Sequence, residues 1–166
     1  MSSTSFDSLL AALLDSWDRN NTILVNLARA IPASAMDARV MDGSPTIGQM
    51  LAHMHYCRLI FIEEDAPEFA IPLPHGEWRK ERDPEKLAAL LNESAKALRT
   101  TVAARIVSGV PMQRHYDHPI LMLQHFIWHE GYHHGQIKLA LKMAGQQLTD
   151  DDASDITWGV WMNKTT

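Results

Sequence analysis

Apolar residues recur at steps of three and four along most of this chain, the period of a helix with one buried face. The first such stripe predicts a helix from about Phe6 to Ile31, which Pro32 closes. Asn20 interrupts the apolar face, so we expect either a buried amide with satisfied hydrogen bonds or a residue that supports a site. The apolar positions of this helix are Leu10, Leu13, Trp17, Leu24, Leu27 and Ile31.

Three further helices are predicted from capping and closing residues. A polar cap followed by proline starts two of them, because that hydroxyl or carboxylate accepts from free backbone N–H groups and proline suits the first helical position. Glycine ends two of them, since it readily adopts the left-handed conformation found there. The predicted spans are about 45–65 after Ser44-Pro45, about 84–109 after Asp83, and about 119–145 from Pro119 to Gly145.

Four helices of about 20–27 residues, without a credible strand or linker, predict an all-α fold: a four-helix bundle formed by a single domain over residues 1–166. The connection over 66–82 is proline-rich and long for antiparallel neighbours. We expect it to cross the bundle or cover one end, which leaves the order of helix directions open. The tail after Gly145 carries an acidic run and two tryptophans but no helix in this prediction.

Charge and cysteine content narrow the partners and the compartment. The formal net charge is −5, and no cluster of Lys or Arg provides a surface for nucleic acid or an acidic membrane. Cys57 is the one cysteine, so no intrachain disulfide can form. No N-terminal apolar run is long enough for a signal peptide or a membrane span. We therefore expect a cytoplasmic protein with neither a nucleic-acid nor a membrane partner.

The fourth predicted helix contains His129-Glu130-Gly131-Tyr132-His133, the pattern H-E-x-x-H. Residues four apart lie one above the other on a helix, so His129 and His133 can reach one metal ion. On a helical wheel they share the inward face with His125 and Gln136, while the lysines lie opposite. A metal would satisfy several of these buried imidazoles at once. The alternative is that they are ordinary half-buried histidines.

The second predicted helix supplies a facing third histidine. His53 lies on an apolar stripe and completes the predicted ligand set His53, His129 and His133. His55 points about 200° away on the wheel, so we expect it at the surface or at an interface. Cys57 lies one turn beyond His53, where a small buried hydrophobic residue is expected.

Three neutral imidazoles leave a metal with an open coordination position, as in catalytic sites, and suit zinc, nickel, iron or copper. Glu130 is a candidate general base, although it could instead anchor a histidine or face a neighbouring helix. His125 and Gln136 are candidates to support the ligands from behind. Tyr132 could bring its hydroxyl to the site or simply pack there.

H-E-x-x-H also suggests a zinc metallopeptidase. The extended peptidase motifs need a third histidine where Leu139 stands, or a downstream glutamate, and no glutamate follows Glu130. No predicted strand is available to align a peptide. A peptidase is therefore a poor third hypothesis.

Two segments resemble the DinB/YfiT-like family of metalloenzymes: residues 46–55 around His53, and His129-Glu130-Gly131-Tyr132-His133-His134-Gly135-Gln136-Ile137. The closing residues 158–162 are also similar to that family's C-terminal segment. The resemblance implies a bundle in up-down-down-up order, one divalent metal (zinc, nickel or iron) on His53, His129 and His133, and a homodimer. It also implies a thiol S-transferase, with a low-molecular-weight thiol such as bacillithiol, mycothiol or glutathione as co-substrate, or a related small-molecule hydrolase or isomerase. The alternatives are a non-catalytic metal-binding stress or damage-response protein and a bundle whose histidines hold no metal.

Overall fold

The computed structural model describes residues 3–162 and confirms an all-α bundle of four long helices. In this part of the chain no helix is both long and apolar enough to cross a membrane. The long helices are α1 (Ser3–Ala30), α2 (Ile47–Asp65), α3 (Pro84–Ser108) and α4 (Pro119–Met143), and single 3₁₀ turns lie at Ala33–Ala35 and Pro67–Phe69.

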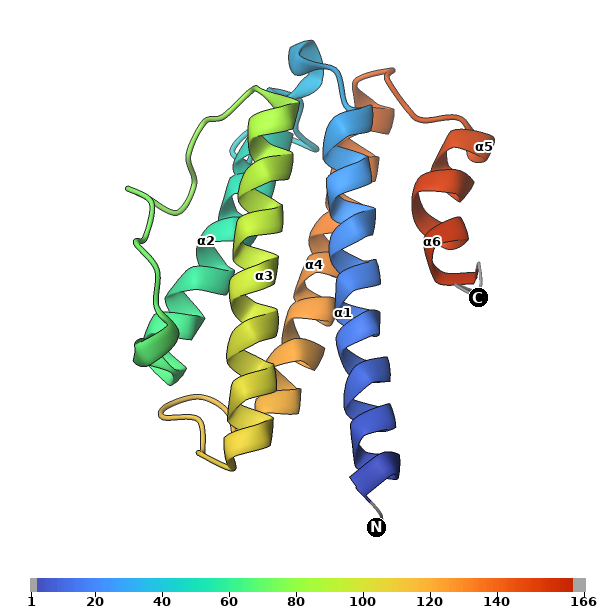
Figure 1. Cartoon of the computed structure of the whole chain (residues 1–166). Coiled ribbons are helices and arrows are strands. Elements are labelled where there is room, and N and C mark those ends of the chain that lie inside the picture. Colours follow the sequence, from blue (N-terminus) through green and yellow to red (C-terminus); the bar gives the residue numbers. More distant parts are fainter. Residues whose placement is uncertain (1–2, 163–166) are drawn as a thin grey trace.

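The helices run up, down, down and up in chain order (Figure 1). The parallel pair α2 and α3 requires the chain to climb back along the bundle after Asp65. The long connection does this along one side of α2, as Figure 1 shows. Its length therefore follows from the topology, and it brings loop residues beside the middle of α2.

Helix α2 begins two residues later than the sequence predicts. Thr46, rather than Ser44, is the cap: its side chain accepts from the N–H of Gln49, and the Gln49 side chain accepts from the N–H of Thr46. This reciprocal capping box satisfies two donors, whereas a cap at Ser44 with Pro45 would satisfy fewer. The predicted starts at Pro84 and Pro119 are confirmed.

A further helical segment was absent from the prediction. It consists of α5 (Asp150–Ala153), a π-helical stretch (Ser154–Trp158) and α6 (Gly159–Met162), and it runs down beside α1 (Figure 1). Thr149 caps its start by accepting from the N–H of Asp152. At its other end Arg19 of α1 donates to the carbonyl of Val160 at 2.5 Å. Contacts with α1 thus hold a segment too short to be stable alone.

The core is divided into two apolar clusters by a polar layer. One cluster includes Leu24, Met54, Leu91 and Ile137, and the other includes Trp17, Ile62, Leu98 and Phe126. Between them, each long helix contributes at least one buried polar side chain. The members of this layer are Asn20, Asn21, Arg58, Ser94 and Glu130.

Gly48 is expected to be the least replaceable glycine of the bundle. A Cβ there would lie 2.1 Å from the carbonyl oxygen of Glu81, which belongs to the long connection. Gly48→Ala must push that backbone away, and we expect it to lower the free energy of unfolding by about 1–3 kcal/mol. Urea denaturation measures the change.

Gly135→Ala is the matched control, because a Cβ at this helical position meets nothing within 4 Å. Alanine costs less backbone entropy than glycine, so this variant should gain about 0.4–1 kcal/mol. Equal effects of the two substitutions would contradict the proposed role of the Gly48 contact.

Candidate metal centre

Three imidazoles from two helices converge on one point. His53 comes from the middle of α2, and His129 and His133 come from successive turns of α4. The Nε2 atom of His129 lies 3.2 Å from Nε2 of His53 and 3.2 Å from Nε2 of His133. These three residues form a group whose ligand atoms all lie close enough to hold one metal ion.

The spacing of these nitrogens fits a shared cation. Two imidazole nitrogens on a tetrahedral metal, each about 2.0–2.1 Å from it, are about 3.3 Å apart. Burial, together with the neighbouring His133 and His53, lowers the pKa of His129 to about 3. Burial also lowers the pKa values of His53 and His133. All three rings are therefore neutral at neutral pH, which is the protonation state that binds metals.

Two of the candidate ligands, His53 and His133, are held from behind. The Nδ1 atom of His53 lies 2.8 Å from a carboxylate oxygen of Glu77, and Nδ1 of His133 lies 2.8 Å from Oε1 of Gln136. Because these oxygens only accept, they favour the tautomers with the proton on Nδ1 and the lone pair on Nε2. Both Nε2 lone pairs then face the common point.

Gln136 connects the site to Tyr132. Its amide nitrogen donates to the Tyr132 hydroxyl at 2.9 Å, and its oxygen accepts from His133. This chain fixes the orientation of the amide and hence that of the imidazole. Tyr132 is 56% exposed, so it lies at the outer edge of the site.

His125 lies beside the ligands, one turn before His129, with ring centroids 6.0 Å apart. Its Nδ1 atom is 2.7 Å from the hydroxyl of Tyr116. Nδ1 of His129 itself is buried and has no hydrogen-bond partner within residues 3–162. The third candidate ligand, His129, is therefore positioned by packing rather than by a hydrogen bond from behind.

Glu130 belongs to the polar layer of the core. Its carboxylate oxygens lie 2.5 and 2.9 Å from the Nε and Nη2 atoms of Arg58, and the amide of Asn20 donates to it at 2.5 Å. The side chain is fully buried. These contacts favour the alternative that Glu130 faces neighbouring helices, and its role as a general base stays a prediction. The expectation of a buried, satisfied amide at Asn20 is confirmed.

The position expected for His55 is wrong. This histidine is buried, and its Nδ1 lies 2.8 Å from the carbonyl oxygen of Leu90 on α3. Helix α2 packs against α4 on the side of His53 and against α3 on the side of His55. The prediction assumed that only the apolar stripe around His53 is buried, whereas both sides are. Cys57 is partly buried, with Sγ 3.5 Å from Nδ1 of His53.

Sequence reasoning missed two residues of the long connection. Besides Glu77, the indole of Trp78 stacks on the ring of His53 with centroids 4.0 Å apart and planes 3° apart. Gln49 holds this loop by donating to the carbonyl of Trp78 at 3.1 Å. The sequence feature that could have indicated these two residues is an acidic residue next to an aromatic one, within a loop that was expected to cross the bundle or cover one end of it.

Removal of the Glu77 carboxylate should weaken metal binding. Without that acceptor the His53 ring loses its fixed tautomer and part of its basicity, so Glu77→Ala is expected to lower zinc affinity about 10–100-fold. Competition with a chromophoric chelator measures the constant. Glu63→Ala, at an exposed position of α2, should leave it unchanged. An unchanged affinity in Glu77→Ala would contradict the role given to this carboxylate.

A family model described as the DinB family matches residues 1–160. No curated protein and no solved structure matches the chain.

Proposed function

This chain belongs to the DinB family, and from that premise we propose that it is a metal-dependent enzyme, a thiol S-transferase acting on small molecules. The observation that carries the proposal is the convergence of the Nε2 atoms of His53, His129 and His133. A divalent ion held there would supply a Lewis acid that lowers the pKa of a bound thiol.

The donor set favours catalysis over a purely structural ion. Three neutral imidazoles leave the charge of a divalent cation uncompensated and a coordination position open. Glu77 and Gln136 keep the ligand tautomers fixed, and the Trp78 indole shields one face of His53 from water. The identity of the ion is left open by these ligands.

The thiol in this proposal is a co-substrate. Burial raises the pKa of the Cys57 thiol to about 12, with the nearby carboxylates of Glu77 and Glu130 acting in the same direction. Cys57 therefore stays protonated at neutral pH and is a poor nucleophile. A free low-molecular-weight thiol would form the new C–S bond, while the leaving group departs with its electron pair and the thiol proton passes to solvent.

Hydrolysis is the second candidate, and the contacts of Glu130 count against its simplest form. A base that activates water needs a free carboxylate oxygen, whereas Arg58 and Asn20 occupy both oxygens of Glu130. Because of these hydrogen bonds to Glu130, we rank the transferase above the hydrolase.

The proposal is tested by following a thiol and an electrophile together. The protein, purified without a histidine tag and loaded with zinc, nickel or ferrous iron, is mixed with bacillithiol, mycothiol or glutathione and with monochlorobimane. We expect equimolar loss of thiol and electrophile that chelation stops and that His133→Ala abolishes. His75→Ala, at an exposed loop position, is the matched control. Metal binding without turnover of any thiol would favour the non-catalytic alternative and contradict the transferase.

We also propose that the chain forms a homodimer through the outer face of α4. Large apolar side chains recur along it at steps of seven and four residues, so they share one face of the helix, and the rings of Trp128 and Tyr132 stack on one another there. The exposed members are Leu121, Trp128, Tyr132, Leu139 and Met143.

Light scattering tests the homodimer. We expect twice the 18.7 kDa mass of one chain for the wild-type protein and one chain mass for Trp128→Lys. Met41→Lys, at an exposed apolar residue outside α4, should remain dimeric. A monomeric wild-type protein at high micromolar concentration would overturn the proposal.

A further inference from the structure

A second cavity lies on the face of α4 that points away from the three histidines. With His129 as origin and about 100° per residue, the lining residues of α4 fall at about 100–200° on the helical wheel. They include Ile127, Gly131, His134 and Lys138. The cavity has a volume of about 390 Å³, within the range of small-molecule sites.

The walls of this cavity are mostly apolar. Ile23 and Leu24 of α1 form one side, Ile127 of α4 another, and Trp158 and Trp161 of the C-terminal helical segment the third. Glu130 also borders the cavity, but it is fully buried and its oxygens are turned to Arg58 and Asn20. The body of a ligand would therefore meet hydrocarbon and indole surfaces.

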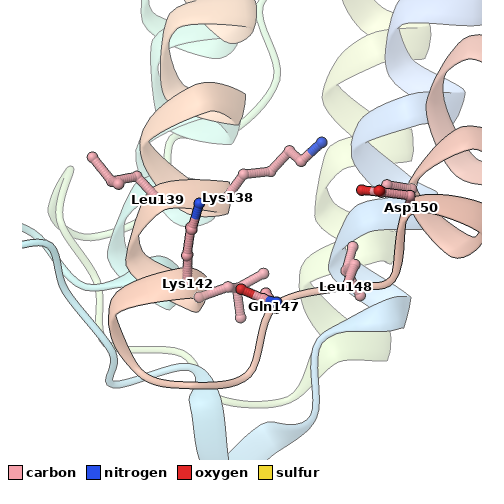
Figure 2. A pocket seen from close by; sticks show the side chains of 8 residues that line it. Lys138, Leu139, Lys142, Gln147, Leu148 and Asp150 are labelled. Atoms are coloured by element: carbon pink, nitrogen blue, oxygen red, sulfur yellow. The ribbon is translucent and has the colours of Figure 1, made fainter.

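One end of the cavity is cationic. Lys138 lines it and also lines an adjoining cavity of about 400 Å³, to which Lys142 contributes. Figure 2 shows both lysines projecting from successive turns of α4 and Lys138 reaching across toward Asp150. Lys138 thus brings an ammonium group to one end of the apolar cavity, on the side where Lys142 and Asp150 line the other cavity.

A buried polar atom also lies beside the apolar cavity. The His134 ring lines it, and Nε2 of that ring is buried without a hydrogen-bond partner within residues 3–162. A buried polar group left unpaired costs about 1–3 kcal/mol. In the tautomer with the proton on Nε2, an acceptor oxygen on a ligand is the complementary group.

We propose that this seam between α4 and the C-terminal segment is a second binding site, and that its ligand is a monocarboxylic acid with an apolar body. The chain or ring lies among Ile23, Ile127 and the two tryptophans, and the carboxylate lies at the Lys138 end, within reach of His134. This site is separate from the three-histidine centre and does not depend on the function proposed for it.

The probe for this site is octanoate, followed in ¹H–¹⁵N spectra of the indole N–H groups. The chain has five tryptophans, and Trp158→Phe and Trp161→Phe assign the two relevant signals. We expect both signals to shift saturably with octanoate, in metal-loaded and in chelator-treated protein alike. Octanol, which lacks the charge, should bind about tenfold more weakly, the ratio that one charge-assisted hydrogen bond gives.

Two substitutions separate the charge from the cavity. Lys138→Gln should weaken octanoate about tenfold and leave octanol unchanged, whereas Lys80→Gln, in the exposed loop, should change neither. Gly131→Leu should abolish both, because a Cβ there meets nothing within 4 Å and the side chain can grow into the cavity. Leucine is the better helix former, and Gly131→Ala provides a smaller step if the larger variant fails to fold.

Three results would overturn the proposal. Equal affinities for octanoate and octanol would exclude carboxylate recognition. Octanoate binding that persists in Gly131→Leu would place it elsewhere on the protein. Indole signals of Trp158 and Trp161 that do not move at millimolar octanoate would exclude the site.

Discussion

Replacing Arg58 with alanine is expected to lower the free energy of unfolding by about 3–5 kcal/mol, the cost of leaving one partner of a buried ion pair alone. The guanidinium is fully buried and makes two hydrogen bonds with Glu130. It also donates to the carbonyl of Leu91 at 2.7 Å and to Asn21 at 2.9 Å, and lies 4.8 Å from the Trp17 ring centroid. Alanine would remove all of these contacts and leave the Glu130 carboxylate uncompensated.

Guanidinium denaturation of metal-free protein measures this loss, and a second arginine provides the control. Arg99 pairs with Asp18 at 3.0 Å, but both side chains are about half exposed. Arg99→Ala should therefore cost at most about 1 kcal/mol. A similar small cost for Arg58→Ala would contradict the role of the ion pair in the core.

The same measurement bears on Glu130. If this carboxylate serves the fold, Glu130→Gln should lower stability with and without metal, and the double variant Arg58→Met, Glu130→Gln should cost less than the sum of the single changes. If it serves as a base, the single variant should retain stability and lose turnover. The stability measurement alone therefore separates the two roles of the H-E-x-x-H glutamate, and it needs no knowledge of the substrate.

The long helices and the convergence of the three histidines were predictable because they depend on local spacing. Periodic apolar residues with proline and glycine at their ends mark the four spans. The i,i+4 pair His129 and His133 is placed on one face by helix geometry alone. His53 could be added because it lies within an apolar stripe, which must face the other helices of any bundle.

The residues that were missed depend on contacts distant in sequence. Arg58 looks like a surface cation until Glu130, 72 residues later, is brought beside it. Glu77 lies in a loop, which has no period from which its direction can be read. The C-terminal helix is short, and its stability comes from α1 and Arg19 rather than from its own propensity. His55 was misplaced because a helical wheel does not show whether a helix is buried on one face or on two.

Replacing His129 with alanine is expected to remove stoichiometric metal binding. Its Nε2 atom is the one that lies 3.2 Å from both other ligand nitrogens, so its loss leaves two imidazoles without the shared partner. In wild-type protein, zinc at about 100 times its dissociation constant should add about 2.7 kcal/mol to the free energy of unfolding. For a chain of this size that raises the melting temperature by about 5–10 °C. The variant should show no such shift, whereas His75→Ala should keep it.

A pH series on metal-free protein tests the same histidine by another route. Its pKa is about 3 in the folded protein and about 6.5 in the unfolded chain. Above pH 6.5 both states carry a neutral ring and His129 contributes no pH dependence. Below pH 6.5 the unfolded chain binds a proton that the folded protein does not bind. The free energy of unfolding therefore falls as the pH is lowered to about 3. His129→Ala should make the free energy of unfolding depend less steeply on pH. The pH dependence that remains should come from His53 and His133, whose pKa values are also lowered. An equal slope in the variant, or metal binding that survives it, would exclude His129 from the centre.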